Sequence, residues 1–176
     1  MRCFIAVDID QEIKEKIMTL QSELPRKGVK IVGPDNLHFT MKFIGECNED
    51  DANYIEESLI REIPKNTRFS VKLSGISVFP NEKNIKVIWI GAPELSELME
   101  KIRKALSRWP DDHSTIPHLT LARVRSPESK QEIQSFLKKH KNDSFGTTII
   151  KTVKLKKSTL TPQGPIYEDL KTFELS

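Results

Sequence analysis

Residues 36–45 read NLHFTMKFIG, and residues 117–123 read PHLTLAR. Each stretch holds a histidine followed two positions later by a threonine, with an apolar residue after each of them. The chain has 4 histidines in 176 residues, so half of its histidines fall into this one pattern. A His-x-Thr pair in a strand is uninformative when it occurs once. Its recurrence in matching contexts predicts one site built from two similar halves.

Both stretches are expected to form β-strands, in which side chains two positions apart point to the same face. His38 and Thr40 would therefore share one face of the first strand, and His118 and Thr120 one face of the second. The same parity places Lys42 on the polar face of the first strand. The residues expected to point into helix-covered cores are Phe39, Met41, Phe43, Leu119 and Leu121.

Strand-like and helix-like patterns alternate along the whole chain, without a linker or low-complexity stretch. Each half carries one His-x-Thr strand closely followed by a helix, which predicts a single bilobal domain over residues 1–176 with an internal duplication. Asn48 is the expected N-cap of the helix after the first motif, and Ser126 with Pro127 is the expected start of the helix after the second. The expected strands cover 2–8, 29–32, 37–44, 69–79, 85–90, 118–124, 147–160 and 167–175, and the expected helices cover 11–24, 49–63, 95–109 and a stretch from 126.

The composition fits an ordinary globular protein, with 30% charged and 37% hydrophobic residues. No apolar run reaches the ~18 residues of a membrane span, and the apolar N-terminal stretch is interrupted too early for a signal peptide. Cys3 and Cys47 are too few for a disulfide framework and lack metal-site spacing, so they are expected to be thiols in a reducing cytoplasm. Residues 151–157 alternate lysine with other residues, which favours either a basic strand face for a phosphate backbone or a solvated outer face.

Two histidines and two threonines in one cleft suit chemistry on a phosphodiester. A neutral imidazole can deprotonate the attacking hydroxyl or water, and a protonated imidazole can give a proton to the departing oxygen. The threonine hydroxyls can donate hydrogen bonds to the non-bridging oxygens. A zinc site would require three or four ligands at short spacings, and neither motif has such neighbours. His113, in a loop, and His140, at a helix end, are expected to be solvent-exposed.

These motifs and their flanks resemble the two-histidine (2H) phosphoesterase superfamily, in the branch of RNA 2′,3′-cyclic phosphodiesterases and 2′-5′ RNA ligases. The resemblance covers nearly the whole chain. The segments that carry it are RCFIAV at 2–7, NLHFTMKFIG at 36–45, VFP at 78–80, VIWIG at 87–91, PHLTLAR at 117–123 and GPIY at 164–167.

The resemblance implies an α+β fold of two pseudo-symmetric lobes, each an antiparallel sheet with helices outside and with the cleft between the lobes. It implies hydrolysis of RNA 2′,3′-cyclic phosphate ends to 2′-phosphomonoesters without metal or other cofactor. His38 would be the general acid and His118 the general base, with Thr40, Thr120 and Arg123 binding the phosphate. In a regular strand Arg123 faces away from His118, so a β-bulge, or the end of the strand near Val124, would have to redirect it.

The resemblance also implies 2′-5′ ligation when a 5′-hydroxyl replaces water, and tRNA halves as the kind of RNA substrate. The expected protein is a cytoplasmic monomer with no membrane or protein partner. Two alternatives remain open, namely a non-catalytic RNA-binding module and a metal-dependent phosphodiesterase. Candidates for stacking on a terminal base are Phe79, Trp109 and Tyr167.

Overall fold

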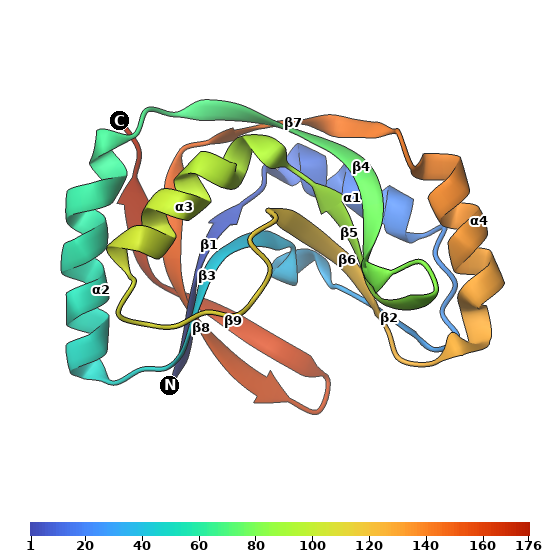
Figure 1. The fold of residues 1–176 in the computed structure, drawn as a ribbon, viewed down its shortest axis with the longest axis horizontal. Coiled ribbons are helices and arrows are strands. Elements are labelled where there is room, and N and C mark those ends of the chain that lie inside the picture. Colours follow the sequence, from blue (N-terminus) through green and yellow to red (C-terminus); the bar gives the residue numbers. More distant parts are fainter.

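The computed structural model describes all residues, 1–176. Nine strands and four α-helices follow one another along the chain, as labelled in Figure 1. Their order is β1 (Arg2–Asp8), α1 (Gln11–Gln21), β2 (Val29–Ile31), β3 (His38–Glu46), α2 (Glu49–Glu62), β4 (Phe69–Asn81), β5 (Asn84–Gly91), α3 (Ser96–Ala105), β6 (His118–Val124), α4 (Lys130–His140), β7 (Ser144–Ile150), β8 (Thr152–Thr161) and β9 (Gly164–Glu174).

The two strands that carry the motifs, β3 and β6, are neighbours in the middle of the sheet. The strand order is β7-β4-β5-β6-β3-β1-β8-β9, with β2 paired to β6 and every pairing antiparallel. Only one residue pair, Phe39 with Leu119, joins β3 to β6. The predicted α+β class with antiparallel strands is confirmed, with one difference. The sheets of the two lobes are continuous through this single pair.

Helices cover the outside of both lobes (Figure 1). Helix α3 packs on β3, and α2 packs against α3 and β9, whereas α1 packs on β7 and α4 on β4. The two halves of the sequence are therefore interlocked, because α1 lies on the lobe of β4–β7 and α3 lies on the lobe of β1 and β3. The internal duplication stays a prediction.

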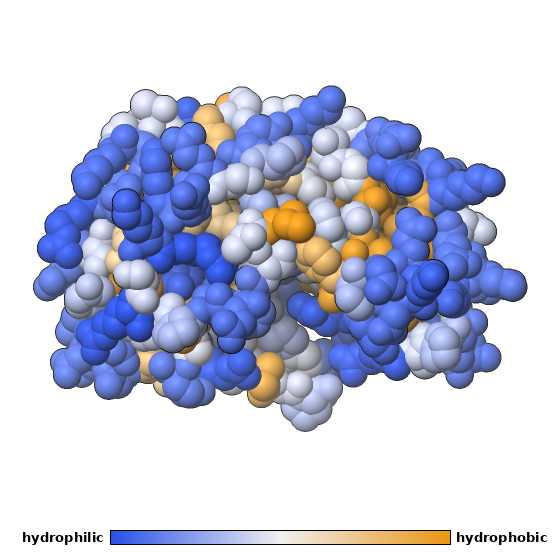
Figure 2. All heavy atoms as spheres, in the orientation of Figure 1, coloured by the Kyte–Doolittle hydropathy of each residue, from blue (hydrophilic) through white to orange (hydrophobic).

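One apolar core runs through both lobes. A single cluster of 41 buried hydrophobic residues contains side chains from all four helices and from both groups of strands. Hydrophilic side chains cover the α2 and α4 ends of the molecule, and less polar residues gather near the centre of the face in Figure 2. None of the helices has the length and apolar character needed to cross a lipid bilayer.

The helix ends follow the sequence signals in part. Asn48 caps α2 as predicted, its side chain accepting the Asp51 N–H at 2.9 Å while the Asp51 carboxylate accepts the Asn48 N–H. The predicted helix start at Ser126 and Pro127 is confirmed in position, because Ser126 is the N-cap and Pro127 the first residue of a 3₁₀ turn (Pro127–Ser129) that leads directly into α4. The Ser126 side chain makes no capping hydrogen bond. Helix α3 ends at Ala105 rather than at 109, and the single strand expected over 147–160 is divided into β7 and β8.

Candidate active site

The same β-bulge interrupts both motif strands at the same position. In β3, Thr40 pairs with Ala6 and Lys42 with Ile5, so that Met41 is an extra residue between two pairs. In β6, Thr120 pairs with Trp89 and Ala122 with Ile88, which leaves Leu121 in the equivalent place. An extra residue shifts the alternation of side chains by one position. As a result, the side chain of the fifth residue after each histidine lies on the same face of the strand as the histidine. These residues are Phe43 in β3 and Arg123 in β6.

The bulges change three predictions made from strand parity. Phe43, expected in the core, is 38% exposed and borders the cleft. Lys42, expected on the cleft face, is 3% exposed, and its Nζ donates to the carbonyl of Trp109 at 2.7 Å. Burial lowers the pKa of Lys42. Arg123 lines the cleft, and of the two expected causes, a bulge or the end of the strand, the bulge is present.

A cavity of about 310 Å³ lies over the junction of β3 and β6. The antiparallel register around the Phe39–Leu119 pair sets His38 across from Thr120, and Thr40 across from His118. The structure brings all five residues predicted for the site into the lining of this one cavity, namely His38, Thr40, His118, Thr120 and Arg123.

Both imidazoles are held by the backbone in the same way. His38 Nδ1 donates to the carbonyl of Asn36 at 2.7 Å, and His118 Nδ1 donates to the carbonyl of Ile116, also at 2.7 Å. A carbonyl oxygen only accepts, so Nδ1 carries a proton in each ring. Nε2 of each ring is left for other partners. His38 Nε2 lies 2.8 Å from the Thr40 hydroxyl.

The surroundings of both rings favour the neutral imidazole. Burial lowers the pKa of His38 to about 4, an effect that the Asn36 carbonyl opposes and the charge of Lys156 reinforces. Burial also lowers the pKa of His118, and the positive charge of Arg123 acts in the same direction. Desolvation disfavours a charged group that has no compensating partner. Near neutral pH each free imidazole therefore has an unprotonated Nε2.

A sequence model of the family described as LigT-like phosphoesterase matches residues 7–89 and 91–167. The chain belongs to this family. Each of the two matched segments contains one His-x-Thr motif.

Curated relatives of this LigT-like phosphoesterase carry the name RNA 2′,3′-cyclic phosphodiesterase. The protein of Methanocaldococcus jannaschii is 40% identical over 175 residues, with 97% of this chain and 99% of the relative covered. The protein of Archaeoglobus fulgidus is 39% identical over 182 residues, with 99% and 100% covered.

Solved structures agree with the fold of this LigT-like phosphoesterase. A crystal structure of a Thermus thermophilus protein matches with a TM-score of 0.85 at 28% identity, covering 99% of this chain and 97% of that one. Escherichia coli LigT complexed with 3′-AMP matches with a TM-score of 0.78 at 22% identity, covering 99% and 98%, and supports the fold alone.

Aromatic rings border both imidazoles of this LigT-like phosphoesterase. The His38 ring lies 5.1 Å from Phe4 and 5.2 Å from Tyr167, centroid to centroid. The His118 ring lies 5.0 Å from Phe79 and 5.8 Å from Trp89. Trp109, one of the three rings predicted to stack on a base, packs instead on Tyr54. The rings around His38 and His118 exclude water from both imidazoles, which explains why the two histidines are desolvated in a cleft that opens to solvent.

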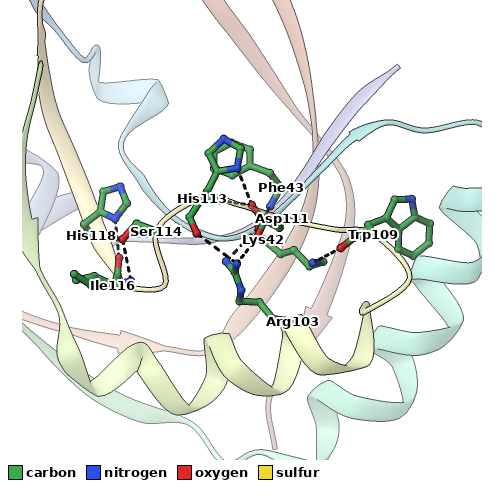
Figure 3. A network of polar contacts seen from close by, with 9 residues as sticks. All are labelled: Lys42, Phe43, Arg103, Trp109, Asp111, His113, Ser114, Ile116 and His118. Atoms are coloured by element: carbon green, nitrogen blue, oxygen red, sulfur yellow. Dashed lines mark hydrogen bonds and ion pairs between the residues drawn. The ribbon is translucent and has the colours of Figure 1, made fainter. Parts of the chain in front are cut away.

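A loop between α3 and β6 connects the second motif to the first lobe (Figure 3). The Asp111 side chain, 1% exposed, accepts hydrogen bonds from Phe43 N at 3.0 Å and His113 Nδ1 at 2.7 Å, and it pairs with Arg103 at 3.2 Å. Burial alone would raise the pKa of Asp111, but hydrogen bonds from the His113 and Phe43 backbone outweigh it and lower the pKa. The loop then supplies the Ile116 carbonyl that holds His118.

Sequence reasoning missed the place of His113. It is exposed as predicted, but its ring packs on Phe43 with centroids 4.0 Å apart, and it lines a cavity next to the cleft together with His118. The signal that could have indicated this is Asp111, two residues earlier, a carboxylate able to fix the ring.

The lysines of residues 151–157 do not form the basic face that was one of the two expectations. Lys154 and Lys156 each lie between the carboxylates of Asp8 and Asp169, with N–O distances of 2.7 to 3.1 Å. This four-charge network is adjacent to the site, because Asp8 pairs with His38 in the sheet. Sequence reasoning did not identify it.

His140 is 8% exposed, so the prediction of a solvent-exposed side chain is wrong. Its Nδ1 lies 2.8 Å from Asp143 and its Nε2 lies 3.1 Å from Glu23. Cys3 and Cys47 are buried free thiols with their Sγ atoms 3.4 Å apart. No group of three or more histidine, cysteine, aspartate or glutamate side chains is arranged to hold a metal ion.

Proposed function

We propose that this protein hydrolyses 2′,3′-cyclic phosphates at RNA ends to 2′-phosphomonoesters, with its two motif histidines as the proton-transfer groups. The observation that carries the proposal is the paired backbone anchoring of His38 and His118 over one cavity. The anchoring leaves the Nε2 atom of each ring for proton transfer, at a site that also contains two threonine hydroxyls and Arg123. The names of the curated relatives support the choice of substrate.

In the proposed reaction, His118 Nε2 takes a proton from water while the water oxygen attacks phosphorus. The bond from phosphorus to O3′ breaks, and His38 gives a proton to O3′. The product keeps its phosphate on O2′. Thr40, Thr120 and Arg123 hold the non-bridging oxygens as negative charge gathers on them. His38 is neutral in the free protein, and the anionic phosphate brought beside it favours the imidazolium that the acid role requires.

The same geometry extends to ligation. A 5′-hydroxyl of a second RNA in the place of water would give a 2′-5′ linkage, with the same bond to O3′ broken. The strained cyclic phosphate supplies the driving free energy, so the proposal includes no nucleotide cofactor. We also propose a functional monomer, since all five predicted site residues of one chain line the same cavity, with tRNA halves among its RNA substrates.

The decisive experiment uses RNA that ends in a 2′,3′-cyclic phosphate, incubated with and without EDTA, with identification of the terminal phosphate isomer. We expect a 2′-phosphate under both conditions. His38→Ala and His118→Ala should each lower kcat by about 10²- to 10⁴-fold, the usual contribution of a positioned proton-transfer group. His140→Gln, a histidine substitution outside the cleft, is the matched control, and circular dichroism checks the folding of all three variants.

The same assay separates the two alternatives. An RNA-binding module would bind RNA in a salt-dependent way without converting the cyclic end. A metal-dependent phosphodiesterase would lose activity in EDTA and regain it on addition of a divalent metal ion. Wild-type turnover in both histidine variants would contradict the proposed roles.

A further inference from the structure

A second cavity, of about 560 Å³, opens beside the cleft. It shares Phe43, Arg123, Arg125, Pro165 and Tyr167 with the cleft, so the two cavities adjoin. We call it the annex, and its additional lining includes Arg2 from β1, Leu160 from β8 and His113 from the loop after α3. Nothing in the proposed hydrolysis of a terminal phosphate requires this additional space.

The annex contains positive charge that the protein does not neutralise. Arg2, Arg123 and Arg125 all line it, and no carboxylate lies within 4.0 Å of any of them, unlike Lys154 and Lys156 nearby. Two acidic residues also border the annex. Asp111 is engaged by Arg103 and His113, and Asp112 is exposed in the loop. Unpaired arginines facing a cavity are typical of sites for phosphate groups.

A pair of packed aromatic rings lies beside these arginines. The His113 ring packs on the ring of Phe43 at 4.0 Å with an interplanar angle of 32°. Asp111 holds both residues, accepting hydrogen bonds from the Phe43 backbone and from His113 Nδ1 (Figure 3). The pair is therefore ordered before any ligand arrives. Every nucleobase has a π-face that can stack on such a surface.

We infer that the annex binds the nucleotide on the 5′ side of the one that carries the cyclic phosphate. Its phosphodiester lies against Arg2 and Arg125, and its base stacks on the Phe43–His113 pair. This inference rests on the proposed function and deepens it, because it makes an oligonucleotide end, and not a cyclic mononucleotide, the preferred substrate. The contacts are to phosphate and to a π-face, so the preference is independent of base sequence.

The test compares a 2′,3′-cyclic mononucleotide with a trinucleotide that ends in the same cyclic nucleotide. We expect the wild-type kcat/KM to be higher for the trinucleotide. Arg2→Ala should raise the KM of the trinucleotide on the order of tenfold, leave the mononucleotide unchanged, and reduce the dependence of trinucleotide kcat/KM on salt. His113→Ala should also raise the trinucleotide KM, and His113→Phe should restore it. Arg61→Ala, an exposed arginine on α2, is the matched control.

Equal wild-type kcat/KM values for the two substrates, or an Arg2→Ala effect that is the same on both, would overturn the inference. A wild-type protein that hydrolyses neither substrate would refute the proposed function instead. In that case, fluorescence anisotropy of a labelled trinucleotide with a 3′-terminal phosphate tests whether the annex binds the neighbouring nucleotide. Weaker binding by Arg2→Ala than by Arg61→Ala supports the annex in that case, and equal binding refutes it.

Discussion

At the scale of single residues, His38 and His118 are equivalent in sequence but differ in their surroundings. Both donate from Nδ1 to a carbonyl two residues earlier. Only His38 has its Nε2 next to a threonine hydroxyl, at 2.8 Å. Only His118 is influenced by the charge of Arg123. The structure thus provides a physical difference between two imidazoles whose separate roles the sequence assigns by resemblance alone.

The pKa of His38 leads to a prediction about pH dependence. Burial disfavours the imidazolium in the free protein and lowers its pKa to about 4, so the fraction able to act as an acid falls as pH rises above that value. A bound anionic phosphate favours the imidazolium and raises this pKa. Because kcat/KM reports the free enzyme and kcat reports the complex, we expect the alkaline limb of kcat/KM at a lower pH than that of kcat. Steady-state profiles on a cyclic-phosphate RNA measure both, and coincident limbs would contradict the prediction.

The thiol of Cys3 gives a second prediction at this scale. Burial, with the neighbouring Cys47, raises the pKa of Cys3 to about 12. The thiolate is the reactive form, and little of it is present four pH units or so below the pKa. We expect Cys3 to resist iodoacetamide at pH 8 in the native protein and to react in guanidinium chloride. Peptide mass spectrometry checks this, and equal labelling in the two states would show that the thiol is accessible.

At the scale of elements, the repeated bulge marks the limit of what the sequence could predict. Strand parity places His38, Thr40, His118 and Thr120 on cleft faces, and the structure brings them together, while their catalytic roles stay predictions. The prediction from strand parity fails after the bulge, where the Phe43 side chain is exposed and the Lys42 side chain is buried. Nothing in the local residue pattern specifies a bulge, because it depends on which residues of β1 and β5 are paired. The burial of His140 likewise depends on the distant Glu23.

Helix α1 contributes to the second bulge through Gln21, and this contact leads to a third prediction. The Gln21 amide, 3% exposed, donates to the carbonyls of Leu121 at 3.0 Å and Val32 at 2.9 Å. The Leu121 carbonyl also accepts from the Val32 N–H at 3.0 Å. Gln21→Ala would therefore remove two buried hydrogen bonds without leaving this carbonyl unsatisfied, at a cost of about 1–3 kcal/mol of unfolding free energy. Since the bulge directs Arg123, KM should also rise. Urea unfolding and steady-state kinetics measure the two effects.

The control for this prediction is Glu15→Ala, an exposed substitution on the same helix. It should leave both the unfolding free energy and KM near the wild-type values. A Gln21→Ala variant with wild-type stability would show that the two hydrogen bonds of the Gln21 amide contribute no net stability. A stability loss without any change in KM would show that Arg123 is held independently of the bulge.

At the scale of the whole molecule, the two lobes are joined weakly through the β-sheet but share one hydrophobic core. Their sheets meet at one residue pair, whereas each lobe is covered partly by a helix from the other half of the sequence. The 41 residues of the hydrophobic cluster form a single connected set. The cleft can therefore lie between two lobes while the His38 and His118 rings keep a fixed relation. A site that divides acid and base between two strands requires this rigidity.

The connected core predicts that both lobes unfold together. Leu59→Ala on α2 and Ile133→Ala on α4 remove fully buried side chains at opposite ends of the molecule (Figure 1). Each should cost about 2–5 kcal/mol and lower one common Tm by about 2–4 °C per kcal/mol. Differential scanning calorimetry should show one transition for the wild type and both variants, with equal calorimetric and van't Hoff enthalpies. Ile60→Ala, 56% exposed on α2, should leave Tm nearly unchanged. Two transitions, of which each core variant shifts only one, would mean that the single Phe39–Leu119 pair and the interlocked helices couple the lobes too weakly to form one folding unit.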